Sequence, residues 1–177
     1  YDRGTLEITV PLENHEFALR LIERFIIILV VEMGMKVKTM GPTTMDREKL
    51  NCGSEPDCAY YIQNQPLVAS REVKFDQDPS PDLVVEVDIT HTDIDKNRLY
   101  AAMEISEFWR YDGLHLRIFQ LQDGAYQERE SSPTFEWVKK DDPYQFLAEA
   151  EHDEVNAEVN FCAYVQEKIK VLQILFE

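Results

Sequence analysis

The chain has 177 residues, of which 44% are hydrophobic and 29% charged; this composition excludes a disordered chain and predicts one globular domain over residues 1–177. The formal net charge of −16 argues against tight non-specific binding to nucleic acid, because such binding depends on Lys and Arg neutralising phosphates. It leaves open a small basic groove, or a partner subunit that carries the positive charge.

Neither a membrane protein nor a disulfide-rich protein is indicated. The longest apolar run, Phe25 to Val31, is far shorter than the roughly 20 residues that a bilayer span requires. The sequence shows no signal-peptide pattern, so we expect a soluble, cytoplasmic protein with no membrane contact. Cys52, Cys58 and Cys162 are odd in number and form no CxxC pair, which predicts reduced thiols.

The first half of the chain predicts one long helix and several strands. His15 to Gly34 is apolar around too much of its circumference for a solvated helix, and Asn14 is the expected N-cap. Residues 41–54, rich in Gly, Pro, Thr, Asn and Ser, predict a loop, and residues 64–80 predict a loop or irregular hairpin. Alternating or apolar segments predict strands at 5–10, Met35–Met40, Glu55–Gln63 and Pro81–Ile89.

In the second half, residues 93–106 predict a helix capped by Thr92, and residues 157–176 predict a C-terminal helix. Between them, an antiparallel meander is expected at 108–111, 114–121 and 126–130, with an edge strand at 134–138. The order of elements predicts an α/β (α+β) domain with a mixed central β-sheet flanked by helices.

The segment Pro81 to Asp88 carries the most informative pattern. Side chains alternate along a strand, so Glu86 faces away from Leu83, Val85 and Val87. A carboxylate buried on such a strand needs a metal or a cation as partner, whereas an exposed strand face would need neither. Asp82 lies four residues away, roughly 13 Å at about 3.3 Å per residue, so it cannot share an ion with Glu86.

A second carboxylate must therefore come from another strand. Asp57 opens an apolar strand directly after a proline, although by itself it is more typical of a turn or cap residue. Together, EPD-CAYYI, PDLVVEV, DIDKNRLY and EFWRYDG resemble, in order and spacing, the Uma family of putative endonucleases. This family belongs to the PD-(D/E)XK superfamily with the restriction-endonuclease fold, and the resemblance runs from about His15 to Leu121.

The resemblance implies metal ligands at Asp57 and Glu86, with help from the backbone carbonyl of Val87. The lysine of the superfamily normally follows two residues after the glutamate, where this chain has Asp88. The family pattern K-x-x-x-Y implies that Lys96 supplies the catalytic amine from the next helix.

Tyr100 completes this pattern on the same helix face as Lys96. Without the motif, Lys96 would be a surface lysine. His15 matches a histidine at the head of the family's first helix, and as a lone histidine it is more typical of a structural role.

The resemblance implies a metal-dependent endonuclease that acts on DNA and makes a homodimer plausible. Hard oxygen ligands of this kind suit Mg²⁺ or Mn²⁺. Asp88 and the acidity favour an alternative, a catalytically inactive nuclease fold that acts as a protein-binding or regulatory subunit. For a nuclease, the acidic C-terminal segment should lie away from the site.

Overall fold

The protein is described by a computed structural model at residues 12–47, 52–89 and 94–176. Within these residues a six-stranded mixed sheet has the order β1-β4-β5-β6-β7-β8. Only β5 and β6 are parallel, and the other neighbours are antiparallel. The strands are β1 (Lys38–Met40), β4 (Cys58–Tyr61), β5 (Leu83–Val87), β6 (Glu107–Tyr111), β7 (Leu116–Gln122) and β8 (Ala125–Arg129).

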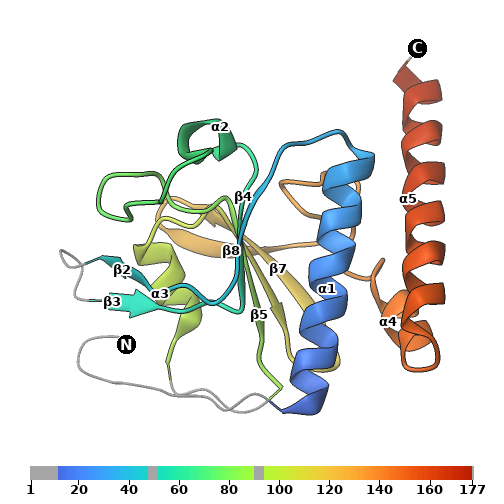
Figure 1. Ribbon diagram of the computed structural model, residues 1–177, viewed down its shortest axis with the longest axis horizontal. Helices are drawn as coiled ribbons and strands as arrows, with labels where there is room; N and C mark the ends of the chain where they lie inside the picture. Colours follow the sequence, from blue (N-terminus) through green and yellow to red (C-terminus); the bar gives the residue numbers. More distant parts are fainter. Residues whose placement is uncertain (1–11, 48–51, 90–93, 177) are drawn as a thin grey trace.

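Helices and a hairpin cover the two faces of this sheet (Figure 1). One face carries α1 (Glu13–Glu32), α4 (Tyr144–Ala150) and α5 (Glu154–Phe176). The other carries α3 (Lys96–Ala102) and the hairpin of β2 (Met45–Arg47) and β3 (Cys52–Ser54), and a short helix, α2 (Gln65–Val68), follows β4. The predicted mixed sheet flanked by helices is confirmed. Within the described residues, every helix falls short of what crossing a bilayer demands.

Helix α1 packs its apolar residues against the sheet and against α5, as its apolar circumference predicted. It ends in a Schellman motif, in which the Met35 N–H donates to the Val30 carbonyl (2.9 Å) and the Gly34 N–H to the Val31 carbonyl (3.1 Å). Gly34 has φ +64°, a conformation that glycine adopts without strain. The expected Asn14 cap is wrong, because the helix begins earlier and Leu12 occupies the N-cap position without a side-chain bond.

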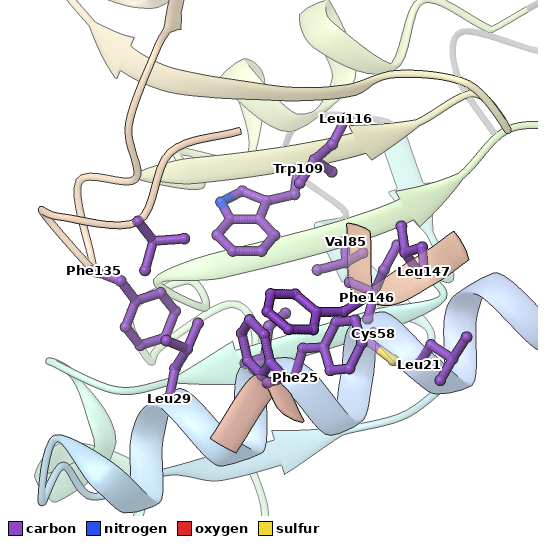
Figure 2. Packing of buried hydrophobic residues seen from close by; sticks show 14 of the residues in the cluster. Leu21, Phe25, Leu29, Cys58, Val85, Trp109, Leu116, Phe135, Phe146 and Leu147 are labelled. Atoms are coloured by element: carbon purple, nitrogen blue, oxygen red, sulfur yellow. The ribbon is translucent and has the colours of Figure 1, made fainter. Parts of the chain in front are cut away.

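The larger core lies between the sheet and the α1–α4–α5 layer (Figure 2). Phe25 of α1 is central to it, with ring centroids 4.4 Å from Phe161 and 6.3 Å from Phe146. On the sheet side, Trp109 meets Phe135 edge-on, with ring centroids 6.2 Å apart. This core fixes α1 against the sheet face formed by Leu83, Val85 and Val87, and so holds β5 in place.

A smaller core on the opposite face positions α3. Tyr100 of α3 packs on Phe108 of β6, with centroids 5.0 Å apart, and Phe108 stacks on Phe119 of β7 at 5.7 Å. Val84 of β5 belongs to this cluster, so β5 alternates between two apolar environments. Because both faces are covered, Glu86 on the same face as Val84 is buried rather than solvated.

Two expectations from the sequence are corrected here. The loop expected at 41–54 contains β2 and β3, because Met45 is buried in the smaller core and its strand pairs with β3. The edge strand expected at 134–138 is a turn, closed by the Val138 N–H donating to the Phe135 carbonyl. The side chains of Phe135 and Val138 reach the larger core although residues 134–138 form no strand.

Element boundaries also shift. Helix α3 is shorter than expected, since Asp95 caps it by accepting the Arg98 N–H at 3.1 Å and Glu104 leaves the helix with φ +59°. Helix α5 begins one turn before the expected start, and the sequence did not predict α2 or α4. The expected strand at 5–10 and the Thr92 cap lie outside the described residues.

Candidate active site

Glu86 lies in the middle of the site, on a strand whose five residues are all buried. Its own exposure is 4%, which rules out the exposed strand face that the sequence left open. One carboxylate oxygen, Oε2, is 2.8 Å from the Lys96 ammonium, and the other, Oε1, accepts the Tyr100 hydroxyl. The carboxylate is thus buried with a cation and a hydroxyl donor, which offset its loss of hydration.

Burial raises the pKa of Glu86 to about 7 against the opposing effect of the Lys96 ammonium, and the charge of Asp57 acts in the same direction as burial. Burial also raises the pKa of Tyr100 well above its usual value, so its hydroxyl remains a donor. For Lys96, burial alone would lower the pKa, but the charges of Glu86 and Asp88 outweigh it and raise the pKa. Lys96 is therefore a fixed cation.

Helix α3 explains why two side chains four residues apart reach the same carboxylate. Lys96 is the first residue of α3 and Tyr100 the fifth, so both project from one face, as predicted. The packing of the Tyr100 ring on Phe108 fixes the helix at this height along β5. The Tyr100 hydroxyl also lies 2.9 Å from Ser54 Oγ, which connects hairpin β2–β3 to the site.

Asp57 lies just before β4 and beside Val87, the residue that follows Glu86 in β5. Its Oδ2 accepts the Val87 N–H at 2.8 Å, and the Nε2 of His15 is 3.2 Å from the same oxygen. The antiparallel pairing of β4 with β5 brings these residues together, with Cys58 opposite Val85. Sequence reasoning missed the contact of His15, because the two residues belong to segments far apart in the chain.

Asp88 occupies the position where the superfamily has its lysine, and its carboxylate helps to hold Lys96. Its Oδ1 bonds to the Lys96 ammonium, and its Oδ2 accepts Nε of Arg110 at 2.8 Å. Arg110 lies opposite Glu86 in the parallel β5–β6 pair. The two carboxylates and two cations therefore form one linked set, of which the sequence had indicated only Glu86 and Lys96.

The candidate site offers a small set of oxygen donors for a divalent ion. Among the described residues, no group of three or more His, Cys, Asp and Glu side chains is placed to hold a metal. Asp57, Glu86 and the Val87 carbonyl are oxygen donors of the type that Mg²⁺ accepts, and Mg²⁺ commonly keeps several waters. Because Val87 donates its N–H toward Asp57 and a strand residue directs its N–H and C=O to the same side, the Val87 carbonyl lies on the Asp57 side of β5.

Other buried carboxylates serve the fold. Asp82 accepts the Ile62 and Asn64 N–H groups at 2.7 and 3.0 Å, and so closes the end of β4. Glu107 accepts bonds from Ser132 and the Thr134 N–H. Neither carboxylate contacts Glu86 in the described structure, so neither belongs to the site.

A groove of about 910 Å³ lies elsewhere, between the first turns of α1 and the α4–α5 corner. Its lining includes Glu13, Phe17, Leu114 and Glu151, but not Asp57, Glu86 or Lys96. Phosphate groups would meet acidic side chains there. The side-chain chemistry therefore favours the Glu86 region as the candidate active site.

A protein-family model described as "Uma2: Putative restriction endonuclease" matches residues 1–147. No curated protein matches the chain. The mixed six-stranded sheet with helices on both faces agrees with the restriction-endonuclease-like fold that the sequence motifs implied.

Proposed function

Because the chain belongs to the Uma2 family, we propose that it is a metal-dependent endonuclease that hydrolyses phosphodiester bonds in DNA. The observation that carries the proposal is the contact of the Lys96 ammonium with Glu86, 2.8 Å, in a buried position beside Asp57. Carboxylates with an adjacent amine are the groups that metal-assisted phosphodiester hydrolysis requires. The Lys96 side chain is only 16% exposed and contacts two carboxylates, unlike the surface lysine that was the alternative from sequence.

In the proposed mechanism, Asp57, Glu86 and the Val87 carbonyl would hold Mg²⁺ or Mn²⁺. The ion, when bound, lowers the pKa of water and neutralises charge on the phosphate. Lys96 orients the attacking water or stabilises the negative charge that develops on the phosphate oxygens. Tyr100 holds the Glu86 carboxylate through its hydroxyl, and His15 and the Val87 N–H hold that of Asp57.

The second candidate, an inactive nuclease fold with a regulatory role, is favoured by one observation. Lys96 is held by Asp88 as well as by Glu86, so its charge is already balanced. In an active enzyme, Lys96 would have to reach the phosphate while it remains paired with these two carboxylates.

A cleavage assay separates the two candidates. Plasmid and short duplex DNA are incubated with Mg²⁺, Mn²⁺ or EDTA, using wild type, Glu86→Gln and Lys96→Met, with Lys168→Met on α5 as the matched control. We expect metal-dependent cleavage that Lys168→Met retains and that the two site variants lose by about 100-fold or more. Folded wild type that cleaves no DNA with either metal, or Glu86→Gln with undiminished cleavage, would overturn the proposal.

A further inference from the structure

Two arginines lie beside the Glu86 site on the same face of the sheet. Arg110 of β6 is opposite Glu86 of β5, and Arg117 of β7 is opposite Arg110. Phe108 and Phe119, two residues along each strand, both belong to the smaller core, which fixes the face on which these side chains lie. Glu86, Arg110 and Arg117 therefore form a row across three adjacent strands.

The dimensions of this row match a nucleic-acid backbone. Neighbouring strands are about 4.8 Å apart, so the backbone of Arg117 is roughly 10 Å from that of Glu86. Successive phosphates on one strand of duplex DNA are farther apart than the axial rise of about 3.4 Å, because the backbone winds around the axis, so the row spans about two phosphates. A phosphate at Glu86 would place its neighbours within reach of the two arginine side chains.

Arg110 is oriented for such a contact. Its Nε donates to Asp88 at 2.8 Å, and its side chain is 31% exposed. Within the described part of the chain, its two terminal nitrogens have no hydrogen-bond partner. A guanidinium fixed through Nε presents these nitrogens as a fork, the geometry that binds phosphate oxygens in pairs.

Arg117 gives the second, independent observation. It is exposed, and it makes no hydrogen bond or ion pair with any residue that the structure describes. Because it lies directly opposite Arg110, the two like charges repel unless an anion lies between them.

Two carboxylates near Arg117 make their hydrogen bonds to other groups, although Asp112 also interacts electrostatically with Arg117. Asp112 accepts the Leu114 and His115 N–H groups at 2.9 and 2.7 Å. Glu130 follows β8 at the level of Arg117, but its carboxylate lies 2.9 Å from the Lys140 ammonium.

We propose that Arg110 and Arg117 form a phosphate-binding strip that holds the DNA backbone next to the Glu86–Lys96 site. This inference rests on the proposed function and adds to it the surface by which a chain of net charge −16 approaches DNA. The acidic residues of α5 lie on the opposite side of the sheet, with the α1 layer (Figure 1). The strip therefore faces DNA away from most of the C-terminal negative charge.

The test measures DNA affinity against salt concentration. A short duplex is titrated with wild type, Arg117→Gln, Arg117→Lys and Arg110→Gln, with Ca²⁺ in place of Mg²⁺ and starting near 10 mM salt. Arg20→Gln on α1 is the matched control, because it removes the same charge on the other side of the sheet. Arg117→Gln is the principal variant, since Arg117 makes no hydrogen bond or ion pair with a described residue whose loss could disturb the fold.

Each phosphate contact contributes about 0.9 to the slope of log affinity against log salt. We expect Arg117→Gln and Arg110→Gln each to reduce this slope by about 1, while Arg117→Lys and Arg20→Gln retain it. In cleavage assays Arg117→Gln should raise KM with kcat unchanged, because it removes ground-state binding.

The outcomes distinguish this inference from the proposed function. Wild type that cleaves DNA, combined with unchanged slope and KM in Arg117→Gln, would overturn the strip and leave the nuclease proposal standing. Reduced slopes in a protein without cleavage would support the strip and reject the nuclease. Absence of wild-type binding near 10 mM salt, where screening is weakest, would overturn the strip.

Discussion

The buried carboxyl of Glu86 should make the metal-free protein less stable as the pH rises. In the folded state burial raises its pKa from 4.5 to about 7. Between these two values the unfolded chain has released the proton and the folded protein has kept it, so the free energy of unfolding falls with pH. The stabilising contribution of Glu86 is fully present below about pH 4.5 and fully lost above about pH 7.

The size of the effect follows from this difference of about 2.5 pH units. At 1.36 kcal/mol per unit, the free energy of unfolding should fall by about 3 kcal/mol across this range. The group is fully buried, so solvent does not screen the effect. Lys96 is a cation throughout the range, because the charges of Glu86 and Asp88 raise its pKa.

The assay is urea denaturation in EDTA at half-unit steps from pH 4.5 to 8, with wild type, Glu86→Gln and an exposed control, Glu72→Gln. The difference between wild type and Glu86→Gln isolates this carboxyl, since all other titrating groups are common to both. If Mg²⁺ binds this carboxyl, its added stabilisation should be larger at pH 8 than at pH 5, because a ligand must be deprotonated. A Glu86→Gln variant with the same pH dependence as wild type would refute the reasoning.

Two further predictions concern packing and backbone conformation. Phe25→Ala should lower the free energy of unfolding by about 3–5 kcal/mol in urea denaturation, because Phe25 packs against Phe146 and Phe161; a loss below about 1 kcal/mol would contradict this packing. Gly34→Ala should cost about 1 kcal/mol because its φ is +64° with no atom near the added Cβ, while Gly41→Ala, equally open, should cost nothing measurable; equal effects would contradict the strain argument.

Local signals were sufficient for most elements of the fold. The apolar circumference of residues 15–34 and Gly34 at their end predicted a buried helix, and α1 ends two residues earlier, at Glu32. The alternation in β5 correctly assigned Leu83 and Glu86 to opposite faces. These features depend on patterns within a few residues, where side-chain direction is fixed by the helix or strand period.

Elements that depend on distant partners were not predictable in this way. Hairpin β2–β3 has a composition typical of a loop, yet Met45 is buried because the smaller core lies beneath it. Residues 134–138 alternate like a strand, but Phe135 reaches the core from a turn. In both cases tertiary packing outweighs local preference.

The features of the candidate site also divide into those set by local sequence and those set by tertiary packing. The sequence by itself determined that Glu86 lies on a largely apolar strand, that Lys96 and Tyr100 share a helix face, and that Asp82 is too distant to join Glu86. Only the tertiary structure decided that the Lys96 ammonium is shared between Glu86 and Asp88.

The tertiary structure likewise decided that His15 contacts Asp57, and that Arg110 and Arg117 continue the row beginning at Glu86. The physical reason is that side-chain direction follows from the period of one element, whereas these contacts follow from strand register and helix placement. Register and placement are set by the whole core, which no local window of sequence contains.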